Sequence, residues 1–242
     1  MNNFNSSIDA FLYWEKKTPL NPFLIQNFED HQKILSYSDV GIEMRKLASF
    51  LIKLGLPKKS HIALLSKNCP HWIMADLAIS MAGFISIPIY PTLTSEGINQ
   101  ILTHSESKAI IIGKLDDFAS QIEGIPDVPI ISVKTFGGNT GKSWEDIIEQ
   151  EEELLDLYLP KNDDLRTIIY TSGTTGQPKG VMHTSGNFTK SSSTFIHILK
   201  LPKNPKFFSY LPLAHVAERA FCNGILFFGG QITFPYSLET FA

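Results

Sequence analysis

The stretch IIYTSGTTGQPKGVM, residues 168–182, determines how the rest of this chain is interpreted. Before it, LRTIIY (residues 165–170) is rich in β-branched residues and predicts a buried strand. That strand runs directly into the loop TSGTTGQPKG, and a helix is expected to begin near residue 186. A strand followed by a loop of small residues is the setting in which proteins bind phosphate. Gly173 and Gly176 permit positive φ angles and a close approach of the backbone to an anion, so that successive N–H groups form a nest.

The side chains of this loop also suit a phosphate group. Hydroxyl donors come from Thr171, Ser172, Thr174 and Thr175. Lys179 adds a cation on a flexible stem, and Pro178 stiffens the backbone before it. The loop lacks the Gly-Lys-Ser/Thr ending of the common P-loop. An ordinary surface turn is the alternative, but the combination of glycines, hydroxyls, proline and lysine favours a phosphate site.

The stretch YTSGTTGQPKG resembles the signature loop of the adenylate-forming (AMP-binding) superfamily, which contains acyl-CoA synthetases, luciferases and peptide-synthetase adenylation domains. The resemblance implies that the loop holds the β- and γ-phosphates of ATP. It further implies that Lys179 is catalytic and stabilises the leaving pyrophosphate. Thr171 would help to hold Mg²⁺ opposite a glutamate that this sequence does not contain.

A second motif narrows the resemblance. SYLPLAHVAERAF (residues 209–221) is similar to the form found in long-chain fatty acyl-CoA synthetases, and residues 61–94 also resemble their N-terminal region. The resemblance implies that His215 is catalytic and lines the acyl and adenylate pocket, together with Gly229 and Gly230 of FFGGQITF. Without that context, a single histidine in an apolar stretch would more often be a core residue.

The sequence also departs from the family. Thr184-Ser185 stands where relatives commonly have Thr-His, and Ala217 stands where the long-chain form often has a larger residue. The family segments for adenine, the ribose and the C-terminal lid with its lysine are absent. We therefore expect the N-terminal portion of a fatty acid–CoA ligase that uses ATP, Mg²⁺ and coenzyme A, and we expect the isolated fragment to be inactive.

The remaining pattern predicts an α/β fold with a mostly parallel sheet flanked by helices, as a partial N-terminal domain of the acyl-CoA synthetase/luciferase-like fold. Ser36 and Asp39 form a capping box before a helix with apolar spacing. Strands are expected at residues 61–66, 85–90, 109–113 and 128–133, with helices between them. The acidic segment 143–159 has a helical pattern. We expect an N-terminal α/β subdomain at 1–160 and the start of the AMP-binding core at 161–242.

Composition limits the other functions. The chain of 242 residues is 43% hydrophobic and 19% charged with a formal net charge of −3, so it is globular and carries no basic excess for nucleic acid. Cys69 and Cys222 are far apart, which fits a reducing cytoplasm, and no signal peptide is evident. Residues 72–90 are apolar, but Asp76, Gly83 and Pro88 interrupt them, which favours a helix and a strand over a membrane span. Peripheral membrane contact remains open and has no local signal.

Three alternatives remain at this level. The acid substrate could be aryl, medium-chain or an amino acid. The chain could be a non-catalytic module that binds a nucleotide or a partner. A P-loop kinase would rest on FGGNTGKS (residues 136–143), where Phe136 occupies the position that requires glycine, so a surface turn is favoured.

Overall fold

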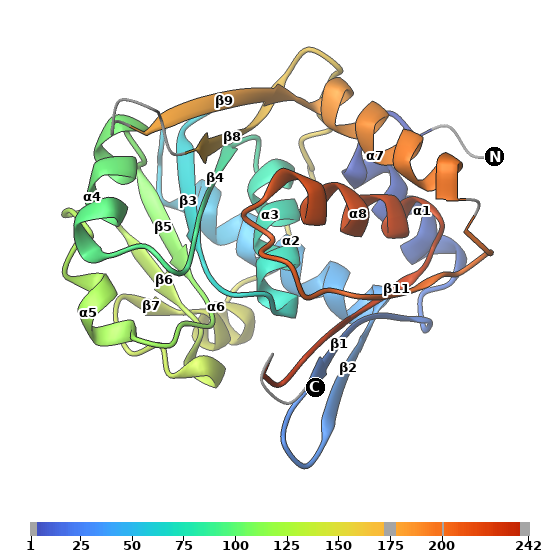
Figure 1. Ribbon diagram of the computed structural model, residues 1–242, viewed down its shortest axis with the longest axis horizontal. Coiled ribbons are helices and arrows are strands. Elements are labelled where there is room, and N and C mark those ends of the chain that lie inside the picture. The colour runs from blue at the N-terminus through green and yellow to red at the C-terminus, as the bar shows by residue number, and fades with distance from the viewer. Residues whose placement is uncertain (1–3, 172–177, 200, 238–242) are drawn as a thin grey trace.

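The structure is a computed structural model that describes residues 4–171, 178–199 and 201–237. In these ranges the strands form two sheets with helices packed around them (Figure 1). The larger sheet has the strand order β7-β6-β5-β3-β4-β8-β9. Its strands are β3 (His61–Leu65), β4 (Ile85–Ile89), β5 (Ala109–Ile112), β6 (Ile130–Ser132), β7 (Lys142–Ser143), β8 (Leu165–Thr171) and β9 (Lys179–Thr184).

Neighbouring strands in this sheet are parallel, except for the hairpin of β8 and β9. Helices cover both of its faces, which explains the continuous apolar character of β3, β4 and β5. The mostly parallel α/β fold that the sequence predicted is confirmed. The helices on one face are α4 (Ser95–His104) and α5 (Phe118–Ile122), and those on the other include α2 (Tyr37–Lys53), α3 (Pro70–Met81) and α6 (Trp144–Gln150).

The smaller sheet joins the two ends of the described chain. Its order is β10-β11-β1-β2, and β1 pairs in parallel with β11. The strands are β1 (Pro22–Asn27), β2 (Gln32–Ser36), β10 (Lys206–Phe208) and β11 (Gln231–Phe234), and the helices beside them are α1 (Ser7–Lys17), α7 (Ser185–Leu199) and α8 (Val216–Phe227). The division expected at residue 160 stays a prediction; in the structure, each sheet draws strands from both sides of it.

Local sequence signals account for several of these elements. Ser36 and Asp39 form the predicted capping box at the start of α2. Every residue of α3 is buried, and Gly83 follows it with φ +78° before β4 begins. The apolar stretch 72–90 is therefore a core helix and a core strand. Across the described ranges, no helix combines the length and the apolar character needed to cross a membrane.

Two segments differ from the sequence prediction. The helical pattern of residues 143–159 gives only α6, and residues 151–160 have no helix. Residues 179–184 form strand β9, whereas the sequence predicted a loop through Gly180 and no strand before the helix near residue 186. The stretch FGGNTGKS starts at the last residue of a 3₁₀ turn (Lys134–Phe136), runs through an irregular segment at 137–141 and ends in the short strand β7.

Candidate active site

The ends of the signature loop lie at the carboxyl edge of the larger sheet. Thr171 is the last residue of β8, Lys179 is the first of β9, and the two are paired across the hairpin. Both residues are exposed. The other expected phosphate ligands, Ser172, Gly173, Thr174, Thr175 and Gly176, lie outside the described residues. The structure therefore fixes where the loop leaves and re-enters the sheet, with a hydroxyl and an ammonium group opposite one another.

Tyr170 attaches the root of this loop to the far face of the sheet. Its side chain packs among the apolar residues beneath α4, and its hydroxyl lies 2.8 Å from Nδ1 of His104. The two rings meet edge to face with centroids 5.6 Å apart. Burial raises the pKa of the Tyr170 phenol, so it remains a neutral hydrogen-bonding group. Successive side chains of a strand point to opposite faces of the sheet. Tyr170 therefore holds the end of β8 on the face opposite to the one that carries the Thr171 side chain.

Tyr90 is a further candidate site residue, which the sequence pattern had indicated only as the end of a strand. It directly follows β4, and Ser86 of β4 is paired with Thr167 of β8. Tyr90 comes as many residues after Ser86 as Thr171 comes after Thr167, so the parallel register places Tyr90 beside Thr171. Ser86 and Thr167 both bond a side chain of α8, so the alternation of the strands places Tyr90 and Thr171 on the α8 face as well. The position before Pro91, at the carboxyl end of a central strand, is the signal that could have identified it.

His215 approaches this edge from α8. It is the N-cap of that helix, and its Nδ1 accepts a hydrogen bond of 3.2 Å from the backbone N–H of Ala217. That bond fixes the tautomer of the neutral ring with a proton on Nε2. The residue is exposed, so Nε2–H is free to donate to a ligand on the outer side. Ala217, where a departure from the family was noted, serves here through its backbone.

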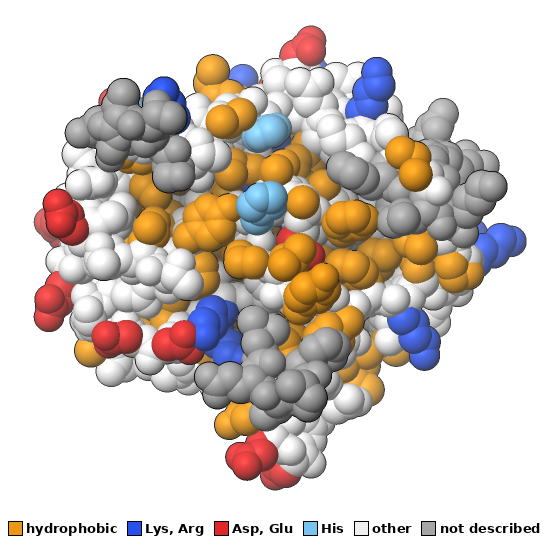
Figure 2. Space-filling model, in the orientation of Figure 1, with side chains coloured by type: hydrophobic (Ala, Val, Ile, Leu, Met, Phe, Trp, Pro, Cys, Tyr) orange, Lys and Arg blue, Asp and Glu red, His pale blue; other side chains and the backbone are white. Residues whose placement is uncertain are grey.

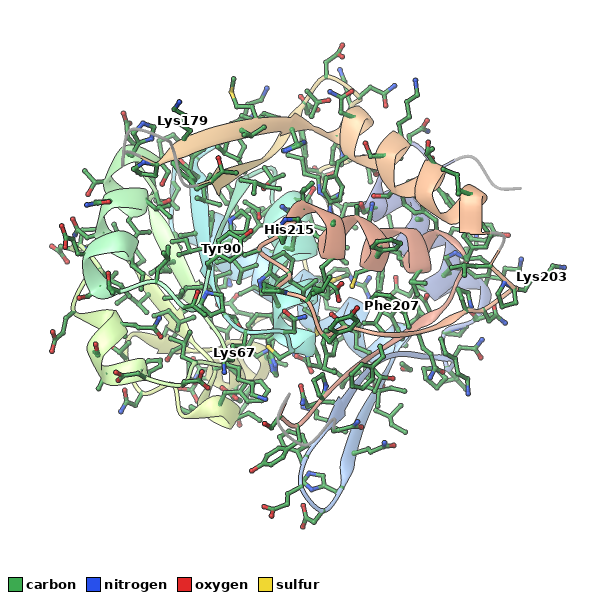
Figure 3. All side chains as sticks on the ribbon, viewed as in Figure 1. Lys67, Tyr90, Lys179, Lys203, Phe207 and His215 are labelled. Carbon is green, nitrogen blue, oxygen red and sulfur yellow. The ribbon has the colours of Figure 1, made fainter. Side chains whose placement is uncertain are left out.

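The surface around His215 is apolar. Tyr210, Leu211 and Val216 are 51%, 44% and 38% exposed. Figure 2 shows hydrophobic side chains gathered across the middle of this face, around two histidines. Figure 3, in the same orientation, shows Tyr90 and His215 near the centre and Lys179 at the outer end of β9. A polar edge beside an apolar surface suits a molecule with a charged head and a hydrocarbon tail.

A buried charge cluster behind the site ties α8 to the sheet. Asp76 of α3 accepts hydrogen bonds from Arg219 Nε (3.1 Å), Arg219 Nη2 and Arg166 Nη2 (3.2 Å). The three side chains are at most 5% exposed. Arg219 Nη1 also donates to Thr167 Oγ1 at 2.8 Å. Burial opposes ionisation of Asp76, but the two arginines outweigh it and lower the pKa of its carboxyl. The cluster therefore fixes the helix that carries His215 against the strand that ends at Thr171.

Gly229 and Gly230 lie at the opposite end of α8 from His215. The helix has 12 residues, which separates its ends by about 18 Å. Gly229 has φ +67°, and a Cβ there would come within 2.7 Å of the Trp14 ring. Gly230 carries the carbonyl that accepts a hydrogen bond from the Tyr37 hydroxyl at 2.9 Å. Both glycines thus serve the packing of α1, α2 and β11, and their place in an acyl pocket stays a prediction.

The residues that would hold ATP and Mg²⁺ can be tested against the described chain. Lys179 is exposed, and its ammonium group has no hydrogen-bond or ion-pair partner among the described residues, so its charge is available to a phosphate. For Mg²⁺ the same edge offers the Thr171 hydroxyl. Over the ranges that the structure describes, no group of three or more His, Cys, Asp or Glu side chains is arranged to hold a metal. The exposed Lys179 ammonium fits a phosphate at this edge, and the Thr171 hydroxyl would offer one oxygen ligand to a cation bound with the phosphate.

Comparison with known proteins decides the family. The model of the AMP-binding enzyme family matches residues 11–241. The chain belongs to the AMP-binding enzyme family. Long chain acyl-CoA synthetase 6, peroxisomal, of Arabidopsis thaliana is 31% identical over 84% of this chain and 31% of its own length. Fatty acyl-CoA synthetase A of Dictyostelium discoideum is also 31% identical, over 84% of this chain and 32% of its own length.

Solved structures agree on the fold of this member of the AMP-binding enzyme family. A long-chain-fatty-acid-CoA ligase of Archaeoglobus fulgidus matches all of this chain and 49% of its own with a TM-score of 0.84 at 20% identity. The N-terminal domain of FACL13 of Mycobacterium tuberculosis matches with a TM-score of 0.83 at 22% identity, over 98% of this chain and 59% of that one. The chain spans about a third of the length of the curated relatives that it matches.

Proposed function

We propose that this chain is the N-terminal part of an ATP-dependent ligase that joins a long-chain fatty acid to coenzyme A. The carboxylate attacks the α-phosphorus of ATP and forms an acyl-adenylate with release of pyrophosphate. The thiol of coenzyme A then attacks the acyl carbon, forms the thioester and releases AMP. The named activity of the long-chain acyl-CoA synthetase relatives supports this substrate class.

The observation that carries the proposal is the pairing of Thr171 with Lys179 at the carboxyl edge of the larger sheet, with the helix that His215 caps packed against β8. Thr171 and Lys179 are paired at the two ends of the signature loop, and His215 is exposed on the helix that faces them. Charge grows on the pyrophosphate as it leaves, and a fixed cation with hydroxyl and N–H donors lowers the energy of that state. Mg²⁺, held in part by Thr171, would supply further charge neutralisation.

The same geometry supports one direction for the bound fatty acid. Its carboxylate lies beside Thr171 and Tyr90, with His215 Nε2–H as a hydrogen-bond donor. Its hydrocarbon chain follows the exposed apolar surface of Tyr210, Leu211 and Val216. Removal of that surface from water favours a long chain by about 0.8 kcal/mol for each CH₂ that becomes buried.

The test is ATP–pyrophosphate exchange with palmitate and Mg²⁺. It compares this chain with an extended protein, in which the C-terminal part of a long-chain acyl-CoA synthetase relative follows this chain. Lys179→Ala should lower exchange by about 10²–10³-fold, as loss of one preorganised charge donor does elsewhere. The matched control is Lys203→Ala, an exposed lysine on another part of the molecule (Figure 3), which should leave exchange unchanged.

Each outcome bears on the proposal. We expect exchange only in the extended protein, since the chain spans about a third of the length of the curated relatives that it matches. Exchange by this chain alone would contradict the expected inactivity of the fragment. A folded extended protein, checked by circular dichroism, that exchanges with amino or aryl acids and not with palmitate would overturn the fatty-acid assignment. Absence of exchange with every acid would favour a binding module.

A further inference from the structure

The segment that delivers His215 has no regular secondary structure, yet it is firmly held. It connects β10, which ends at Phe208, to α8, which begins at Val216. Ser209, Leu213 and Ala214 are at most 1% exposed, while the residues between them face outward. No helix or strand hydrogen bonds hold the exposed residues 210–212 in place. The segment therefore needs anchors, which are hydrogen bonds from other parts of the protein.

One side chain supplies three of these anchors. Asn68 Nδ2 donates to Ser209 Oγ at 2.9 Å and to the Leu211 carbonyl oxygen at 2.6 Å. Asn68 Oδ1 accepts from the backbone N–H of Leu213 at 2.9 Å. Two donor contacts and one acceptor contact are satisfied only with the amide in this orientation. A single carboxamide thus holds three positions of the segment at once.

The hydrogen bonds continue from this amide to α8. Ser209 Oγ, which accepts from Asn68, donates in turn to Glu218 Oε1 at 2.7 Å. The same carboxylate oxygen accepts from the backbone N–H of Tyr210 at 3.1 Å. Glu218 is 1% exposed, so the relay lies out of water, where each bond depends strongly on the next. The segment is therefore fixed both to Asn68 and to the helix that His215 caps.

Asn68 is itself placed rigidly by the larger sheet. It stands between β3, in the middle of that sheet, and α3, whose residues are all buried. The preceding residue, Lys67, donates its backbone N–H to the Lys114 carbonyl oxygen at 2.7 Å. Asn68 therefore projects from the same carboxyl edge that ends, two strands away, at Thr171.

We propose that Asn68 is a positioning residue of the ligase: by holding Ser209, Leu211 and Leu213, it sets the position of His215 and the apolar wall relative to the sheet edge that binds phosphate. This inference rests on the function proposed above. The nucleotide side of the site, Thr171 and Lys179, is built on β8 and β9 and makes none of these contacts. Loss of the Asn68 amide should thus affect the acid and spare ATP.

The first measurement uses the 242-residue chain and hydrogen exchange. Asn68→Ala should speed exchange of the Leu213 amide at least tenfold, while amides of β3 keep their protection. The control is Asn99→Ala, which removes an exposed asparagine whose Nδ2 likewise donates to a backbone carbonyl, that of Gly124, at 3.0 Å. It should leave the Leu213 amide unchanged. An unchanged Leu213 amide in Asn68→Ala would contradict the role of Asn68 as the anchor.

The second measurement uses the extended protein and initial rates of acyl-CoA formation. Asn68→Ala should lower kcat/KM for palmitate by about 10–100-fold, because small displacements of a positioned group cost that much. The KM for ATP should stay within about twofold of the unchanged protein. If Asn68→Ala does not fold, Asn68→Asp has nearly the same volume. It keeps the acceptor for Leu213 and turns a carboxylate oxygen toward the Leu211 carbonyl, so it should show the same selective loss.

The results separate the two proposals. Equal losses for palmitate and ATP, or no loss for either, would overturn the positioning role while leaving the ligase assignment intact. A folded extended protein without palmitate activity, before any substitution, would remove the proposed function and this inference with it. A selective loss for palmitate in Asn68→Ala, absent in Asn99→Ala, is the expected result.

Discussion

Replacement of Asp76 by alanine should strongly destabilise the protein. Its carboxylate is the anion in the cluster with Arg166 and Arg219, whose side chains are 4% and 2% exposed. Without it, two buried guanidinium groups would face each other with hydroxyl and aromatic neighbours alone as compensation. Removal of one partner of a buried ion pair typically costs about 3–5 kcal/mol. That is a large share of the total stability of a domain, which is about 5–15 kcal/mol.

Urea unfolding followed by tryptophan fluorescence measures the loss, and thermal unfolding should show a midpoint lower by about 6–20 °C. The control is Asp30→Ala, since the side chain of Asp30 is 87% exposed and, within the part of the chain that the structure describes, forms an ion pair with its surface neighbour His31 alone. It should leave both midpoints unchanged. A loss below about 1 kcal/mol for Asp76→Ala would refute the reasoning, because it would mean that the arginines are not desolvated in the folded state.

Further predictions concern other parts of the molecule. Tyr90→Phe in the extended protein should lower kcat/KM for palmitate about 10–100-fold with unchanged thermal stability, as loss of one hydrogen bond to a charged group does; an unchanged rate would exclude a substrate contact. Gly229→Ala should destabilise by more than Gly55→Ala, because both have positive φ but only at Gly229 would the new Cβ strike the ring of Trp14; urea midpoints of the two variants test this. The folded pKa of Asp76 is lower than its unfolded value, so its stabilisation is complete above about pH 5 and declines as pH falls below about 4. The difference in stability between the wild type and Asp76→Asn should therefore narrow in acid, and a constant difference down to about pH 2 would contradict the lowered pKa.

The elements that the sequence predicted well are those with a local cause. The capping box of Ser36 and Asp39 and the β-branched strands act within a few residues, so they are visible without partners. Strand β9 was missed because Lys179–Gly180–Val181–Met182 is exposed on both faces and shows no alternation. It is a strand only because it pairs with β8.

The helix expected at 143–159 ended early for a reason that lies elsewhere in the chain. After Gln150 the backbone is extended, which lets Glu151 reach Lys53 and Glu153 reach Arg45, both on α2. Leu154 and Leu157 also pack against the core from this extended segment. Tertiary ion pairs and burial thus override a local helical pattern, as they often do for weak propensities.

The candidate site residues were predicted from sequence motifs. The residues that hold them in place were not predicted. Lys179, Thr171 and His215 could be named because their motifs are contiguous. Asp76 appeared in the sequence only as a polar interruption of an apolar stretch, because its partners lie 90 and 143 residues away. Asn68 likewise contacts residues more than 140 positions later. Pairs at such distances leave no pattern in a single sequence.

The pairing of β1 with β11 has a consequence for synthesis on the ribosome. Leu24 pairs with Ile232, which emerges 208 residues later. At about 5–20 residues per second, the β1–β2 hairpin waits roughly 10–40 s for its neighbour. During that time the edge of β1 is open to strands of other chains. The cellular abundance of this protein should therefore depend on chaperones that shield nascent chains during translation.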